Sequence, residues 1–169
     1  MSDEIKFHVG VKALVRNSKG EVLLLKVHKD TIPDHPGAAY WDIPGGRVKW
    51  DSIVRTDSDQ IDWEETIKRT LKREVAEETG ITTVEVVELF SFDISNISYP
   101  ISTGEIMGLI LRTYICRFDT GHSIDLSEEH SEYRWFAPEQ AANRLSIKYP
   151  TKFCDAIAHL PVAQKEANQ

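Results

Sequence analysis

The sequence predicts an α/β domain, because strand-like and helix-like segments follow one another in a characteristic order. Strand-like segments come first, one long helix-like segment follows, further strands come next, and two helix-like segments close the chain. The length of 169 residues suits one domain with a hydrophobic core. A hydrophobic fraction of 41% and a charged fraction of 28% are typical of a globular domain. We expect one domain over residues 1–160 and a flexible polar tail over residues 161–169.

The first strands form a hairpin in this interpretation. Residues 6–16 are rich in strand formers, and residues 21–28 contain an apolar run that suits a central strand. The turn-forming residues 17–20 lie between them. Residues 40–43 are a further strand-like run, and they lead directly into the turn sequence Pro44-Gly45-Gly46.

Residues 63–79 predict one long helix. They contain ordinary helix formers without Pro or Gly, and Gly80 follows in the position of a left-handed cap. Ile67, Leu71 and Val75 recur every four residues, so this strip should face the core. The polar segment 51–62 precedes the helix, and either Asp59 or Asp62 is expected to cap its first turn.

The second half of the chain continues with strands and ends in helices. Residues 82–93 and 105–118 have strand-like patterns, and an acidic loop beginning at residue 126 leads to a short strand that ends at residue 136. Residues 138–144 predict a short helix with Pro138 in its first turn, and residues 149–160 predict an amphipathic helix.

The overall charge and the cysteines exclude several classes of protein. A net charge of -7 argues against binding long nucleic acid through a basic surface. Cys116 and Cys154 form no metal-binding or redox motif, so we expect two reduced structural thiols. The start has no signal-peptide pattern, and no apolar run approaches eighteen residues. We expect a cytoplasmic protein without a membrane segment.

Three carboxylates should share one edge of the long helix. At about 100° per residue, Glu74 and Glu78 lie about 40° apart, and Glu77 lies about 60° beyond Glu74. This edge borders the buried strip, where a carboxylate can be held in place. Oxygen ligands at helical spacing, without a matching His and Cys set, suit Mg²⁺ or Mn²⁺ better than zinc. The alternative is a solvated helix face with ion pairs such as Arg73 with Glu77.

The acidic helix resembles a known sequence motif. Arg73-Glu74-Val75-Ala76-Glu77-Glu78-Thr79-Gly80-Ile81, with Glu65 eight residues before Arg73, is similar to the core of the Nudix box. The box normally opens with a Gly six places before that Glu, where this chain has Asp59. The equivalent here is Gly46, nineteen places before Glu65, so the loop carries thirteen extra residues. The departure concerns how the loop meets the substrate and leaves the helix intact.

The resemblance implies a fold and a set of site residues. The fold would be an α/β/α sandwich with a mixed central sheet. Glu74 and Glu78 would be the principal metal ligands, and Glu77 a direct or water-mediated third, with Arg73 and Glu65 holding them in place. The general base would come from a late loop, where Glu129 is favoured and Glu132 and Glu128 are close competitors; Glu105, at a strand start, is a fourth candidate.

The resemblance also implies substrate-binding residues. Arg47, which follows Gly45 and Gly46, would lie near the substrate phosphates, and a guanidinium is suited to gripping phosphate oxygens in pairs. From its position after the loop 30–39, Trp41 is a further candidate, which would stack on a base; the alternative is that Tyr40 or Trp41 packs in the core.

The function implied is metal-dependent hydrolysis of a nucleoside diphosphate linked to another group, by attack of water on phosphorus. The partner would be a small nucleotide, and family members often pair as homodimers. One alternative is a non-catalytic nucleotide-binding or regulatory module on the same fold. A second is an isoprenyl-diphosphate isomerase, which would need a catalytic cysteine. The motif does not specify which nucleotide is bound, because the selecting residues lie in loops outside it.

Overall fold

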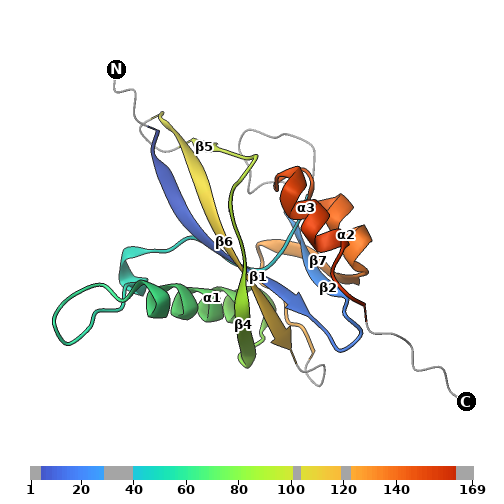
Figure 1. The fold of residues 1–169 in the computed structure, drawn as a ribbon, viewed down its shortest axis with the longest axis horizontal. Coiled ribbons are helices and arrows are strands. Elements are labelled where there is room, and N and C mark those ends of the chain that lie inside the picture. The colour runs from blue at the N-terminus through green and yellow to red at the C-terminus, as the bar shows by residue number, and fades with distance from the viewer. Residues whose placement is uncertain (1–4, 29–39, 101–103, 119–122, 163–169) are drawn as a thin grey trace, which may run out of the picture.

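The computed structural model describes residues 5–28, 40–100, 104–118 and 123–162 (Figure 1). Its elements are, in order, β1 (Phe7–Arg16), β2 (Val22–Val27), β3 (Trp41–Asp42), the 3-10 helix η2 (Trp50–Ser52), α1 (Trp63–Thr79), β4 (Val84–Ile94), β5 (Tyr99–Pro100), β6 (Ile106–Phe118), β7 (His130–Phe136), α2 (Pro138–Leu145) and α3 (Thr151–Ala158). Within these ranges, no helix has the length and apolar character needed to cross a membrane. Most of the expected tail, residues 163–169, lies outside the described residues.

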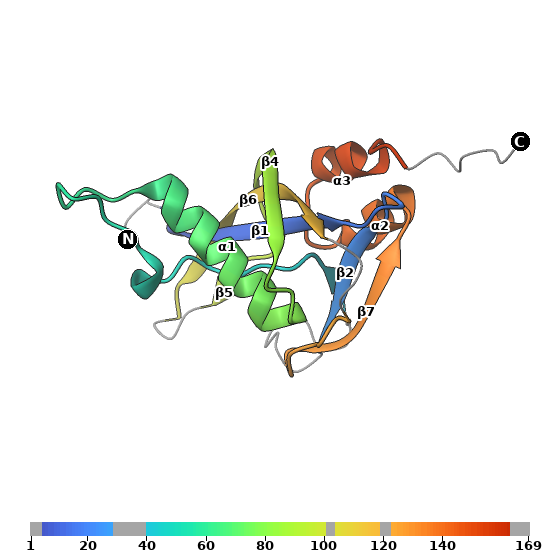
Figure 2. The ribbon, with the colours of Figure 1, turned by 90° about the horizontal axis from the view of Figure 1, so that it is seen from below.

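The strands form a mixed sheet between helices. Its order is β3-β2-β1-β6-β4, with β7 also paired to β2 and β5 to β6. β1 and β6 are parallel, and the other strand pairs are antiparallel. α1 covers one face, where Ile67, Leu71 and Val75 pack on the sheet. α2 and α3 cover the other face (Figures 1 and 2). The predicted α/β/α sandwich is confirmed.

The strands of the predicted β1–β2 hairpin pair near their turn and then separate, and the space between them is called the fork. The two strands pair at Arg16 and Val22, near the turn, and β2 then pairs with β3 instead. The chain after β3 crosses to β1, where the N–H of Ala13 donates to the carbonyl of Pro44 and the N–H of Val11 to that of Gly46. This crossing brings the Gly45-Gly46 turn into the fork, against β1.

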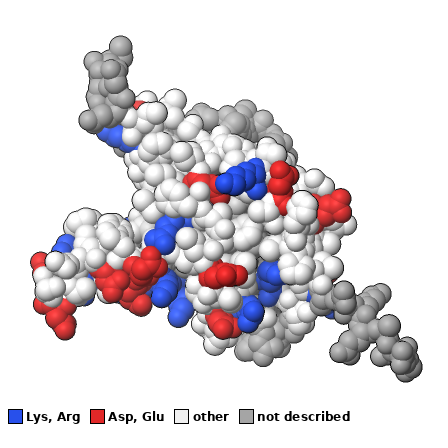
Figure 3. All heavy atoms as spheres, in the orientation of Figure 1, with Lys and Arg blue, Asp and Glu red and all other residues white. Residues whose placement is uncertain are grey.

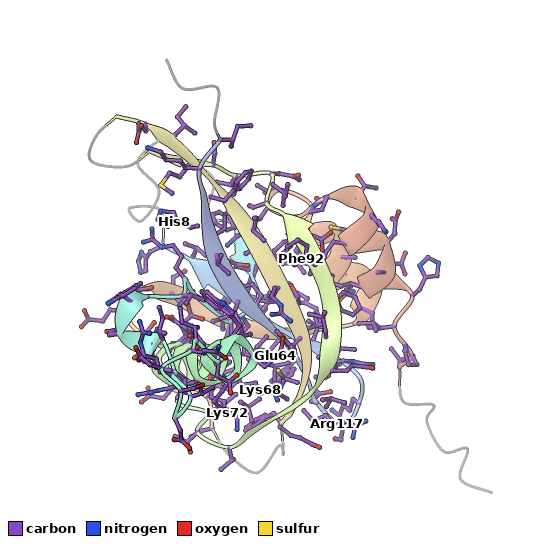
Figure 4. The ribbon with its side chains drawn as sticks, turned by 60° about the vertical axis from the view of Figure 1, so that its left-hand side comes forward. His8, Glu64, Lys68, Lys72, Phe92 and Arg117 are labelled. Atoms are coloured by element: carbon purple, nitrogen blue, oxygen red, sulfur yellow. The ribbon has the colours of Figure 1, made fainter. Side chains whose placement is uncertain are left out.

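α1 begins and ends where the sequence indicates. The Asp62 side chain accepts a hydrogen bond from the N–H of Glu65, and Gly80 has the left-handed φ of 72°. Glu64, Lys68 and Lys72 recur at four-residue intervals on the edge of α1 that faces β6 and β4 (Figure 4), and Glu64 bonds Arg112 of β6 at 2.9 Å. Because Glu74 is about 200° around the helix from Lys72, the acidic edge faces away from this row.

The extra loop is a small hairpin attached to the start of α1. Arg55 and Ile61 form a bridge, and the N–H of Asp62 donates to the carbonyl of Val54. Asp59, in the usual place of the opening Gly, has φ 59°, a left-handed conformation that Asp tolerates better than most residues. The hairpin projects beyond α1 (Figure 2), and acidic side chains gather at its tip (Figure 3).

The positions of β7 and α3 differ from the sequence prediction in ways that concern the site. β7 begins at His130, so Glu132 lies in the strand and not in the acidic loop before it. α3 begins at Thr151, two residues later than predicted, because Pro150 takes the cap position and has no N–H to give to a preceding helical turn. Tyr149 stands outside the helix, and its hydroxyl bonds Asp42 at 2.7 Å.

Candidate active site

The Gly45-Gly46 turn meets α1 at its acidic edge. Gly45 has φ 136°, and a Cβ there would collide with the carbonyl oxygen of Val11, so a residue with a side chain would be strained at this position. A Cβ on Gly46 would collide with the carboxylate of Glu74. The absence of side chains therefore lets the turn lie between β1 and the helix. This close approach supports Gly46 as the displaced opening residue of the box.

Glu74 and Glu78 are both buried at this turn, each 9% exposed. The Glu78 carboxylate accepts a hydrogen bond from the N–H of Gly45 at 2.8 Å, and Glu74 pairs with Arg73 at 2.6 Å. Glu77 is exposed, and Arg73 bonds it as well, at 2.9 Å. One arginine thus holds two of the three predicted ligands.

The environment of Glu78 penalises its negative charge. Burial raises the pKa of Glu78 to about 7, and Asp42 and Glu74 act in the same direction. Lys12 and the hydrogen bond from Gly45 partly oppose this shift. A carboxylate held in such a place gains stability from a nearby cation.

A cavity of about 270 Å³ opens beside Glu78. Gly45, Gly46 and Arg47 line it from the turn, and Glu129 lines it from the loop before β7. The predicted turn residues and the favoured general base, Glu129, therefore border one cavity. Arg47 is exposed at this cavity, with its charge near His8.

Deep in the cavity wall lies a buried charge network centred on Asp42. Lys12 and Lys148 both donate to its Oδ2 atom, at 2.8 and 2.5 Å, and the hydroxyl of Tyr149 donates to Oδ1. Burial alone would raise the pKa of Asp42, but the two ammonium groups outweigh it and hold the pKa well below its usual range. Asp42 is therefore ionised and paired.

His130 is a second feature that sequence reasoning missed. It is 9% exposed, lines the cavity, and its Nε2 lies 3.9 Å from Oε1 of Glu78. Its Nδ1 lies 3.3 Å from the hydroxyl of Ser127. Burial, and then the charge of Lys12, lower its pKa, so the neutral form is favoured. The signal in the sequence is a single histidine among acidic residues, and it carries no spatial information.

The other residues expected in the site lie apart from it. Glu132 is in ion pairs with Lys26 and Arg134 on the sheet, and Glu105 pairs with Lys6. Glu65 is exposed in the first turn of α1, about 13 Å along the helix axis from Glu74.

The aromatic residue at the cavity is Tyr40. It lies directly before the predicted Trp41 and lines the space beside Glu78. Trp41 packs its ring edge-on against Phe136, with centroids 5.1 Å apart. Of the two roles that the sequence left open for Trp41, core packing is the one seen in this geometry.

The residues present fit a hard divalent cation by chemistry. Within the described ranges, no three acidic, His or Cys side chains are already gathered as a metal site. Glu74 and Glu78 nevertheless bring buried carboxylate oxygens to the same turn, and Glu77 is one helical step away. Oxygen donors of this kind suit Mg²⁺ or Mn²⁺.

A family model for the NUDIX domain matches residues 6–153. The chain belongs to the NUDIX family. It is therefore a Nudix-type pyrophosphohydrolase, of a family that acts on nucleoside-diphosphate-linked substrates. This agrees with the motif on α1 and with the fold.

Solved structures agree with this membership. The Nudix domain is similar to a MutT protein from Methanosarcina mazei, with TM-score 0.61, 28% identity, and coverage of 94% of this chain and 96% of that one. It shares its fold with an Ap4A hydrolase from C. elegans (TM-score 0.60, 18% identity, 89% and 95% coverage). The same holds for the E. coli dihydroneopterin triphosphate pyrophosphohydrolase (TM-score 0.53, 16% identity, 91% and 95% coverage). Comparison with curated proteins gave no match.

Proposed function

We propose that this Nudix domain hydrolyses a nucleoside diphosphate linked to another group, by attack of water on one phosphorus of the diphosphate. Glu74, Glu78 and Glu77 would hold Mg²⁺ or Mn²⁺, and Arg73 would orient Glu74 and Glu77 through its two hydrogen bonds. The bound ion supplies Lewis-acid chemistry, which withdraws charge from phosphate oxygens. The observation that carries the proposal is the pair of buried carboxylates at the Gly45-Gly46 turn, beside the cavity.

The remaining roles belong to residues that line this cavity. Arg47 would grip phosphate oxygens, since a guanidinium offers paired donors to them. Glu129 would take the proton from the attacking water, because it is the predicted base that lines the cavity. The backbone of Gly45 and Gly46 would let a phosphate approach closely, since neither residue has a side chain.

The metal-ligand assignment is tested by Glu78→Gln in a phosphate-release screen. The substrates are ADP-ribose, sugar nucleotides, oxidised nucleoside triphosphates and dinucleoside polyphosphates, each with Mg²⁺ and with Mn²⁺. We expect turnover to fall by about a hundredfold or more, because a ligand and its charge are lost. Glu139→Gln, on the exposed first turn of α2, is the control and should keep wild-type turnover. Equal rates for wild type and Glu78→Gln would refute the assignment.

The base assignment is tested by comparing Glu129→Gln with Glu132→Gln. Loss of a general base typically reduces the rate about 10²- to 10⁴-fold, and we expect that loss in kcat for Glu129→Gln. Glu132→Gln should change kcat little, because Glu132 is engaged with Lys26 and Arg134. Stopped-flow or steady-state kinetics at saturating metal measures both variants. A large loss confined to Glu132→Gln would reverse the assignment.

The alternatives have less support. The isomerase would need a reactive cysteine, whereas burial raises the pKa of Cys116 to about 12 and so keeps the thiol protonated. A non-catalytic module draws support from the hairpin 54–62 in the box loop, and it would bind nucleotide in the same screen without releasing phosphate.

A cytoplasmic location and a homodimer stay predictions. Light scattering of the purified protein tests whether it forms a homodimer.

A further inference from the structure

Lys12 is a buried cation in the middle of β1, with all its hydrogen bonds directed to one short segment. It is 5% exposed, and its ammonium donates to Asp42 Oδ2 at 2.8 Å, to the carbonyl of Ile43 at 3.1 Å and to the carbonyl of Gly45 at 3.0 Å. An ammonium has three donors, so these three acceptors use its full capacity. Lys12 thus ties β1 to the start of the Gly45-Gly46 turn.

Gly45 is consequently held from two sides. Its carbonyl accepts from Lys12, and its N–H donates to the Glu78 carboxylate at 2.8 Å. Behind it, a Cβ would stand 2.9 Å from the Cα of Lys12, so the turn is pressed on β1. A shift of the Gly45 carbonyl would move the N–H that anchors Glu78, since Gly45 carries both contacts.

Lys148 offers a matched comparison. It is 4% exposed and also donates to Asp42 Oδ2, at 2.5 Å, but it comes from the connection between α2 and α3. Within the described residues, Lys12 bonds both Asp42 and the Gly45 carbonyl, whereas the hydrogen bond of Lys148 goes to Asp42. The two lysines therefore share burial and a partner, and they differ in the bond to the turn.

We propose that Lys12 is a positioning residue of this site: through the Gly45 carbonyl it sets the turn that orients Glu78, and so it tunes the affinity of the site for a divalent cation. The inference rests on the proposed function, in which Glu78 is a metal ligand. It adds to that function a residue on β1, outside the helix motif, which acts through the turn without contact with the metal.

The test compares Lys12→Met with Lys148→Met in the full chain, using Mn²⁺ alone as probe. Free Mn²⁺ is measured by electron paramagnetic resonance, and thermal unfolding is followed on the same samples. We expect Lys12→Met to weaken Mn²⁺ binding roughly ten- to a hundredfold, as for other residues that support metal ligands. Both variants should lower the melting temperature. Lys148→Met should change Mn²⁺ affinity less than about threefold, since Lys148 reaches the turn through Asp42.

A purely structural role gives a different pattern. Mn²⁺ affinity equal to wild type in folded Lys12→Met, with only a lower melting temperature, would overturn the inference. Equal losses of affinity in both lysine variants would overturn it too. If Lys12→Met does not fold, Lys12→Gln replaces it with the same expectation, because its shorter amide is uncharged and cannot serve all three acceptors.

Phosphate release from the nucleotide panel, measured on the same samples, separates this inference from the proposed function. Wild type that binds Mn²⁺ but hydrolyses no nucleotide would contradict the proposed function, while the Mn²⁺ comparison still decides the role of Lys12. Wild type that hydrolyses nucleotide, with both lysine variants unchanged in Mn²⁺ affinity, would contradict only the inference. Wild type that binds no Mn²⁺ would overturn both.

Discussion

At the scale of single residues, Glu78 shows how a ligand position differs from an ordinary helix glutamate. Glu77, its neighbour, is exposed and paired with Arg73, whereas Glu78 is buried and bonded to a backbone N–H. Its raised pKa, about 7, means that the metal-free protein holds this carboxylate at a cost in stability. The metal-free fold is therefore less stable because Glu78 is buried, but the burial keeps its carboxylate where a divalent cation can bind it.

This cost has a definite pH dependence. A carboxyl group whose pKa is raised on folding binds a proton more tightly when folded, so its penalty is absent below the unfolded value of 4.5 and grows until the pH passes about 7. We expect Glu78→Gln to raise the unfolding free energy at pH 8 without metal, by up to about 3 kcal/mol, and to change it little at pH 4.

Denaturant unfolding at the two pH values measures the effect, with Glu77→Gln as the exposed control. Added Mg²⁺ should stabilise wild type and leave Glu78→Gln less affected, since binding to the folded state adds to stability. A stabilisation of Glu78→Gln that is equal at both pH values would contradict the origin given for it.

Gly46 is the second residue whose size matters. Because a Cβ would collide with the Glu74 carboxylate, Gly46→Ala should displace that ligand and reduce turnover about as strongly as Glu74→Gln, without unfolding the protein. The two substitutions together should cost much less than the sum of their separate effects, because they act on one contact. Kinetics of the two single variants and the double variant measure this. Additive losses would show that Gly46 acts elsewhere.

At the scale of elements, α1 carries different charged side chains on two edges: a mixed row that faces the sheet and an acidic edge that holds the predicted ligands. The row of Glu64, Lys68 and Lys72 faces β6 and β4 (Figure 4), and the ligand edge faces the Gly45-Gly46 turn. The acidic edge could be predicted from helical spacing. What the ligand edge meets could not, because the turn arrives from residues about thirty positions earlier in the chain.

The start of α1 is secured by a local bond. The Asp62 side chain caps the helix through the N–H of Glu65 at 3.0 Å, and the hairpin 54–62 ends at this residue. We expect Asp62→Ala to lower the unfolding free energy by about 1 kcal/mol, as for other lost N-caps. Asp57→Ala, at the hairpin tip, should change it by less than about 0.5 kcal/mol. Urea denaturation compares them; equal effects would argue against the cap.

At the scale of the whole molecule, Asp42 connects the layers of the sandwich. Its carboxylate receives Lys12 from β1, and Lys148 and Tyr149 from the connection between α2 and α3. This polar contact between the sheet and the α2–α3 layer therefore lies beside the candidate active site.

Loss of this carboxylate should destabilise the fold strongly. Asp42→Asn leaves two buried ammonium groups without their anion, so we expect a loss of about 3–5 kcal/mol at pH 7. Because the folded pKa of Asp42 is depressed, its contribution is complete above the unfolded value of 3.8 and declines as the pH falls below it. The difference between wild type and Asp42→Asn should shrink below about pH 4, as measured by urea unfolding. A constant difference would mean that the charge does not matter.

The sequence by itself determined most of the strands and helices and the acidic edge of α1. Helical spacing and the chain order of strands and helices are local properties, and the motif resemblance supplied the layering. Only the tertiary structure brought Lys12, Asp42, His130 and Lys148 to one cavity, separated Glu129 from Glu132, and turned Trp41 toward Phe136. These arrangements depend on where the fork between β1 and β2 admits a turn from far along the chain. The residue spacing within one segment does not predict these long-range contacts, because each contact is formed by packing between segments that are far apart in the sequence.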